Sequence, residues 1–245
     1  MITRKNQNAL SSQEWADFID AINQTHGVAA KAPAYRAFVK VHERAMNPTD
    51  MQGMSWGVHT MGPMMRGRNF LSWHRQFVLR LALRLQKVHP AVTIPYWDAV
   101  TDRSIPEPLD DPALLASWGV TRDWDASLLP HKSDVTALNG FATFTAFQAA
   151  IEGAVHAGVH NAVGGDMETG SSPSDPLFWL HHANIDRLWA KWQKQHPSVK
   201  PPNMTETLRP TPLFGVKVAA VQNITKLGYK YASAYRADSE RYNMS

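Results

Sequence analysis

The sequence predicts a mainly α-helical protein, in which four helices form a bundle joined by long loops and a few short strands. Several long segments repeat apolar residues at the period of an amphipathic helix. The chain has 245 residues and 44% hydrophobic content, which suffices for one domain with a large core. We therefore expect a single domain over residues 1–245, with its core at about 30–235.

The most strongly patterned segment is residues 174–192. Asp175 and Pro176 predict its start, as N-cap and first helical residue. The predicted buried stripe consists of Phe178, His182, Ile185, Trp189 and Trp192. Asp186 lies one turn after His182, within side-chain reach, whereas His181 falls on the neighbouring face. A histidine inside such a stripe needs a hydrogen-bond partner or a metal, since an unsatisfied buried polar group is costly.

Two further helices are predicted nearer the N-terminus. A Ser-x-x-Glu capping box opens the first, at about 12–25. The second spans about 33–46 and carries His42 inside its apolar stripe. Residues 46–68 are rich in Met and Gly and have no period, so they predict a loop, which contains His59.

The next helix is predicted at about 69–88, again with a histidine, His74, in the apolar stripe. Arg75 is expected on its outer face, either in solvent or paired with a carboxylate near the bundle. Residues 93–97 predict a short extended piece. The prolines and scattered acids of 98–139 predict a long surface excursion with short helices.

A further helix is predicted over about 141–160, where His156 and His160 stand one turn apart beside the apolar edge. The tail after this bundle is irregular and rich in proline. Short strands are predicted in it at about 213–220 and 227–232.

Composition excludes several classes of protein. The chain has no cysteine, so disulfides, thiolate catalysis and iron–sulfur clusters are absent. The net charge of +4 is spread over helix faces, so no nucleic-acid partner is predicted. No run of ~18 apolar residues predicts a membrane span. The N-terminus shows no signal peptide, which predicts a cytoplasmic protein, or one exported with a partner.

The histidines within the stripes indicate a metal site in the bundle. His156, His160 and His182 make one set of three, and His42 and His74 supply two ligands of another. An all-imidazole site suits copper or zinc, with an open position for an exogenous ligand. The alternative for each histidine alone is a core residue with a hydrogen-bond partner.

Four motifs follow one another along the chain: FLSWHR (70–75), IPYWD (94–98), VHAGVHNAVGG (155–165) and DPLFWLHHANIDRLW (175–189). In this order they resemble the tyrosinase family of type 3 copper proteins, over roughly residues 35–235. LGYKY (227–231) is similar to the terminal tyrosine motif of that family. The resemblance implies one catalytic domain, a helical bundle with two copper ions, and oxidation of a small phenolic substrate by O₂.

The resemblance also implies the ligands. Copper B is held by His156, His160 and His182, and copper A by His42, His74 and a third residue. At the family's usual position for that third histidine this chain has Met65. We assign His59, which is the only histidine between the other two; the alternative is an incomplete copper A site. The thioether bond of many members cannot exist here, because cysteine is absent.

The substrate class is predicted from residues beside copper B. In the family a glutamate, here Glu152, holds a water, and an asparagine that helps it is replaced here by Ala157. Asn161 is expected at the pocket rim, and Gly170 near the place of a bulkier residue over copper B. We therefore expect oxidation of o-diphenols or o-aminophenols ahead of monophenol hydroxylation.

Two alternatives stay open. The first is a full tyrosinase with monophenolase activity. The second is a haemocyanin-like dioxygen carrier, which a cover over copper B would distinguish. A di-zinc hydrolase would need carboxylate ligands that the pattern lacks. A partner protein that delivers copper is a further expectation from the family.

Overall fold

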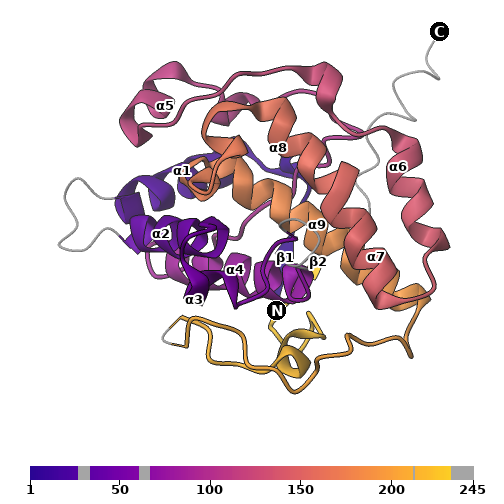
Figure 1. Cartoon of the computed structure of the whole chain (residues 1–245). Coiled ribbons are helices and arrows are strands. Elements are labelled where there is room, and N and C mark those ends of the chain that lie inside the picture. The colour runs from indigo at the N-terminus through magenta and orange to yellow at the C-terminus, as the bar shows by residue number, and fades with distance from the viewer. Residues whose placement is uncertain (27–33, 61–66, 212, 233–245) are drawn as a thin grey trace, which may run out of the picture.

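The computed structural model describes residues 1–26, 34–60, 67–211 and 213–232 (Figure 1). These residues form a mainly helical molecule, as the sequence predicts. The α-helices are α1 (Ser12–His26), α2 (Ala34–Met46), α3 (Met51–Met54), α4 (Phe70–Leu85), α5 (Pro112–Trp118), α6 (Lys132–Ala137), α7 (Phe144–Ala150), α8 (Gly158–Val163) and α9 (Pro176–Gln195). Two strands, β1 (Ile2–Arg4) and β2 (Tyr229–Tyr231), complete the regular structure together with a π-helical segment, η5 (Ile151–Ala157), and short 3₁₀ turns.

Helices α4 and α9 pack against each other in the middle of the molecule. In Figure 1, α2 lies on one side of this pair and α7 and α8 on the other. Aromatic side chains fill the space between them, with the rings of Phe77 and Trp179 4.7 Å apart and those of Phe38 and Phe77 5.6 Å apart. Burial of large aromatic rings is the main source of stability in such a core.

The predicted helix starts are confirmed where they depend on caps. The Ser11 backbone N–H donates to Glu14, and the Glu14 backbone N–H donates to the Ser11 hydroxyl, which closes the capping box of α1. The Asp175 carboxylate accepts the Leu177 N–H at 2.8 Å, with Pro176 in the first turn of α9.

The helix predicted over 141–160 is interrupted. It is divided into α7, the π-helical segment η5 and α8, and Gly153 departs from helical geometry inside η5 with ψ of −121°. A wide π turn shifts the register of the residues that follow it. His156 therefore lies in η5 and His160 in α8, rather than on one continuous helix.

The excursion over 98–139 carries short helices, as predicted, and α5 and α6 lie at the top and right of Figure 1. The strand predicted at 213–220 is wrong: this stretch holds one isolated bridge, Thr207 to Lys217, and a 3₁₀ turn at Val218–Val221. The strand predicted at 227–232 is confirmed as β2, which pairs in parallel with β1.

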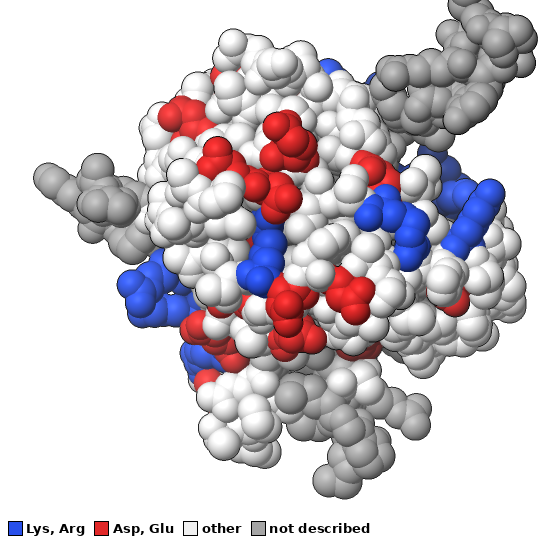
Figure 2. Space-filling model, turned by 90° about the horizontal axis from the view of Figure 1, so that it is seen from above, with Lys and Arg blue, Asp and Glu red and all other residues white. Residues whose placement is uncertain are grey.

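Figure 2 shows acidic and basic side chains interspersed over one face of the molecule. Among the residues that the structure describes, no helix combines the length and apolar character needed to cross a bilayer.

Candidate metal centre

Seven buried or nearly buried histidines form two groups in the middle of the bundle. One group contains His42, His59 and His74; the other contains His156, His160, His181 and His182. Within each group the ring nitrogens lie within 4.8 Å of one another. The helices α2, α4, η5, α8 and α9 supply all of them except His59, which follows α3 in an irregular stretch.

Hydrogen bonds donated to backbone carbonyls fix the orientation of four of these rings. The acceptors are Gly170 for His42 (2.8 Å), Phe70 for His74 (2.8 Å), Glu152 for His156 (3.2 Å) and Met167 for His160 (2.6 Å). In each case Nδ1 faces the carbonyl and so carries the proton. The lone pair is therefore on Nε2, which is the tautomer that a metal ligand requires.

The two groups touch. The His74 and His182 rings stack with their centroids 4.2 Å apart, and the His59 and His156 rings lie 5.8 Å apart. Because α4 and α9 pack directly against each other, they bring one histidine of each group face to face. The arrangement suits two metal ions side by side rather than two separate sites.

The ring nitrogens that face inward fit copper. The Nε2 atoms of His74 and His156 are buried without a hydrogen-bond partner among the described residues. Unsatisfied buried nitrogens are costly, and a metal that accepts their lone pairs removes that cost. Burial lowers the pKa of His42 and of His160 to about 4, so these imidazoles are neutral at physiological pH. Neutral imidazole without carboxylate or thiolate is a donor set typical of copper.

The sequence separated His182 from His181 by helix face, but the structure buries both at 1% exposure. His182 Nε2 lies 3.4 Å from His160 Nε2, and its ring also stacks on His74. The His181 ring contacts His156 and His160 and lies at the other side of this group. Because α9 is buried nearly all round, its apolar stripe does not show which histidine is turned inward.

The residues predicted to control the substrate lie as follows. Ala157 is half-buried in η5, and Asn161 is exposed on α8. The Glu152 side chain is buried, which raises the pKa of its carboxyl. Gly170 packs against α2, and its carbonyl accepts a hydrogen bond from His42; its expected place over copper B stays a prediction. Met65 lies outside the described residues.

A buried ionic network lies behind the histidines and confirms the alternative in which Arg75 pairs with a carboxylate. Arg75 is 1% exposed, contrary to the prediction of an outward side chain, and it pairs with Asp186. Tyr229 donates to the same carboxylate at 2.6 Å, and Arg4 lies over the Tyr229 ring. The network joins α4, α9, β1 and β2 one residue after His74 and one turn after His182. The sequence signal for this network was the position of Asp186 one helical turn after His182, which brings a carboxylate next to the buried stripe of α9.

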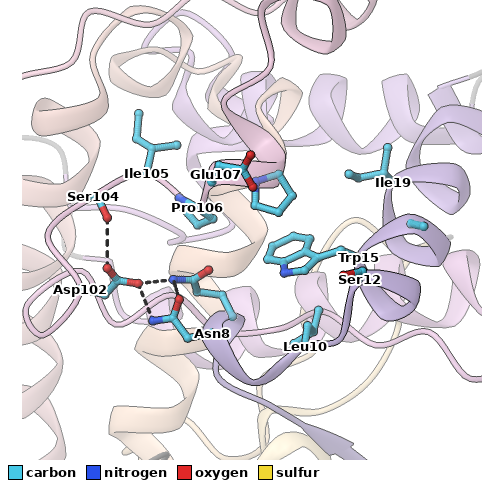
Figure 3. Close-up of a pocket in the computed structure, with 13 residues that line it drawn as sticks. Asn8, Leu10, Ser12, Trp15, Ile19, Asp102, Ser104, Ile105, Pro106 and Glu107 are labelled. Carbon is cyan, nitrogen blue, oxygen red and sulfur yellow. Dashed lines mark hydrogen bonds between the residues drawn. The ribbon is translucent and has the colours of Figure 1, made fainter. Parts of the chain in front are cut away.

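A cavity of about 640 Å³ lies away from these histidines, between the start of α1 and residues 102–108 (Figure 3). Trp15 and Glu107 line it, and Asp102 accepts hydrogen bonds from Gln7, Asn8 and Ser104 at its edge. The Asp102 contacts tie the N-terminal segment to the excursion. None of the histidines of the metal centre lines this cavity.

Comparison with known proteins agrees with this centre. A family model described as the common central domain of tyrosinase matches residues 32–123 and 118–195. A tyrosinase of Streptomyces antibioticus is 33% identical, over 81% of this chain and 85% of that protein. A grixazone synthase of Streptomyces griseus is 28% identical, over 80% of this chain and 85% of that protein.

Solved structures share the fold. A functional unit of octopus hemocyanin has a TM-score of 0.74 at 23% identity and covers 95% of this chain and 68% of its own. A polyphenol oxidase of Thermothelomyces thermophila has a TM-score of 0.70 at 18% identity, over 95% of this chain and 89% of its own. At these identities the likeness concerns the fold alone. Members of the matched family hold a pair of copper ions, and the two histidine groups are suited to such a pair. From its family model and its Streptomyces relatives together, the chain belongs to the tyrosinase family.

Proposed function

We propose that this protein is a type 3 copper oxidase that uses O₂ to convert o-diphenols to o-quinones and o-aminophenols to quinone imines. Monophenol hydroxylation is a weaker activity. The observation that carries the proposal is the pair of touching histidine groups, with inward Nε2 atoms, in a chain of the tyrosinase family.

The proposed ligands are three histidines for each ion: His42, His59 and His74 for copper A, and His156, His160 and His182 for copper B. The copper pair supplies the exchange of electrons with O₂. Each substrate molecule gives up a pair of electrons and a pair of protons, so two catechols reduce one O₂ to water. The chain's own part is to hold neutral imidazoles in place with backbone carbonyls and to exclude water by burial.

The preference for o-diphenols depends on the groups next to His156. Ala157 has no polar side chain to help Glu152 hold a water, and the Asn161 side chain is exposed. Hydroxylation of a monophenol needs deprotonation of the incoming phenol, and general-base help is worth roughly 10²–10⁴-fold. A catechol or o-aminophenol is oxidised more easily and depends less on that help. One relative is named a grixazone synthase rather than a tyrosinase, which supports a choice of substrates in this family that is wider than tyrosine.

The test compares initial rates of the copper-loaded protein on 4-methylcatechol, on 2-aminophenol and on 4-methylphenol, the last measured after any lag. We expect the first two rates to exceed the third by at least about tenfold. Comparable rates on the catechol and the phenol would identify a full tyrosinase instead. Reversible O₂ binding without turnover of any of the three would identify a dioxygen carrier.

A further inference from the structure

His59 differs from the other five proposed ligands in how it is held. The others lie on helices, whose register fixes where their side chains point. His59 lies in an irregular stretch, and its Nδ1 faces the Glu152 carboxylate at 3.8 Å rather than a backbone carbonyl. Something other than helix register therefore has to position this imidazole.

Glu152 is itself held on both carboxylate oxygens by the residue next to His59. The Thr60 backbone N–H donates to Glu152 Oε1 at 2.6 Å, and the Thr60 hydroxyl donates to Oε2 at 2.9 Å. Hydrogen bonds to a carboxylate are stronger than those between neutral groups. These two bonds join the irregular stretch that carries His59 to η5, which carries His156.

Gly67 makes two further hydrogen bonds beside Thr60 and Glu152. The Gly67 N–H donates to the Thr60 hydroxyl at 3.0 Å, and the Gly67 carbonyl accepts from the Gln148 side chain at 2.9 Å. A Cβ at Gly67 would lie 2.9 Å from Glu152 Oε2, so only glycine allows this close approach. Thr60 is thus hydrogen-bonded to η5, Gly67 to α7, and the two residues to each other.

We propose that Thr60 and Glu152 are positioning residues that hold His59 as the third ligand of copper A. We call this pair of residues the Thr60–Glu152 clamp. Because the chain has no cysteine, no thioether can restrain a histidine of this site, and hydrogen bonds supply the restraint. The proposal rests on the proposed function in one respect, the assignment of His59 to copper A. The clamp also assigns Glu152 the role of positioning His59, because both of its carboxylate oxygens accept hydrogen bonds from Thr60.

The first test measures copper retention. Thr60→Val removes the hydroxyl but keeps the shape, and Thr60 is exposed, so the variant is expected to fold. Loss of a residue that orients a ligand typically weakens metal binding by about 10–100-fold. We expect one of the two copper ions to pass to a chelator about tenfold faster than in the unchanged protein, with the other ion unaffected. Thr60→Ser should restore the unchanged rate, because serine keeps the hydroxyl.

The matched control is Thr145→Val, the same chemical change at an exposed position of α7 that borders the same cavity as Thr60 and Glu152. It should release copper like the unchanged protein. Gly67→Ala is the second variant: the added methyl group displaces Glu152, and one copper should again be lost faster. Unchanged copper release in both Thr60→Val and Gly67→Ala would overturn the clamp.

A second measurement needs no copper and separates the clamp from the proposed function. In the metal-free protein the Thr60 amide should exchange its hydrogen at least about tenfold more slowly than an unbonded exposed amide. Glu152→Ala should remove that protection. If the protection is present but the unchanged protein binds fewer than two copper ions, the clamp stands and the proposed function fails. If the Thr60 amide exchanges freely, the clamp is wrong whatever the copper content.

Discussion

His181 and His182 are adjacent, equally buried, and different in what their rings face. His182 lies between the two groups, with its ring 4.2 Å from that of His74 and 5.0 Å from that of His156. His181 contacts only the copper B side among the described aromatic residues. An ion held by the inward nitrogens of this group would therefore be bound by His182 rather than by His181.

His182→Ala is expected to lower bound copper from two ions per chain toward one and to abolish oxidation of catechol. His181→Ala should keep both ions, at a stability cost of roughly 1–3 kcal/mol for a truncated buried side chain. Metal analysis of both purified variants checks this. Equal copper loss in the two would mean that His181 also binds copper.

Ala157 is the residue that sets the balance between the two activities in our account. Ala157→Asn should raise the rate on 4-methylphenol by about tenfold or more relative to the rate on 4-methylcatechol, because the amide helps Glu152 to hold a water. Asn139→Ala, which removes an exposed amide outside the site, serves as the control and should change neither rate much. A ratio that stays constant in Ala157→Asn would show that the missing asparagine does not limit phenol hydroxylation.

At the scale of elements, the end of α8 decides where His160 points. Gly164 ends this helix with φ of +66°, and the next turn brings Met167 round to accept a hydrogen bond from His160. A Cβ at Gly164 would lie 2.5 Å from the Asp123 carbonyl oxygen, so the backbone passes closer here than any side chain permits.

Gly164→Ala should therefore destabilise the metal-free protein more than Gly119→Ala. Gly119 has a similar φ of +67°, but no described atom lies within 4 Å of its added Cβ. We expect a loss of about 1–2 kcal/mol at Gly119, which has the left-handed helical conformation. We expect about 1–3 kcal/mol more at Gly164, from crowding and from its ψ of −167°, which only glycine adopts readily. Urea unfolding of the two variants measures the difference. Equal losses would mean that the Asp123 segment moves aside at little cost.

The sequence predicted the helices whose apolar period is unbroken and whose ends are marked by caps, such as α1 and α9. It missed the interruption at Gly153, because a π turn keeps the local composition of a helix. It missed the partner of Arg75 and the pairing of β1 with β2, because both depend on residues distant in sequence.

All six proposed ligands lie in the two histidine groups that the structure brings together. Five of them were expected from helical apolar patterns and family motifs, and His59 because no other histidine lies between His42 and His74. Their binding of copper stays a prediction. The Thr60 contacts to Glu152 were not predictable, since an irregular stretch has no period to read. The burial of His181 was not predicted, because the apolar stripe indicates one buried face, whereas α9 is packed against other elements on nearly all of its faces.

At the scale of the whole molecule, the cluster of buried histidines makes stability depend on pH. Burial lowers the pKa of His42 and of His160 to about 4, from the ordinary histidine value of about 6.5. As the pH falls from 6.5 toward 4, the unfolded chain binds protons that the folded chain does not. The free energy of unfolding of the metal-free protein is therefore highest above pH 6.5. As the pH falls from 6.5 toward 4 it decreases by up to about 1.4 kcal/mol per pH unit for each such histidine.

The urea concentration at the unfolding midpoint of the metal-free protein should be clearly lower at pH 5 than at pH 7.5. The double variant His42→Gln and His160→Gln should show a smaller drop, because glutamine does not titrate. Copper loading should reduce the drop further at pH 5, since the bound ion competes with protons for the ring nitrogens. A midpoint independent of pH would mean that these histidines are accessible to protons in the folded protein.

The central claim is that six named histidines, five on helical elements of the bundle and one in an irregular stretch, hold two copper ions side by side. The most direct measurement is diffraction from crystals of the copper-loaded protein at the copper absorption edge, with anomalous peaks located against the refined chain. We expect two peaks per chain, one among His42, His59 and His74 and the other among His156, His160 and His182. A single peak, or a copper ion bound by His181 in place of His182, would contradict the account.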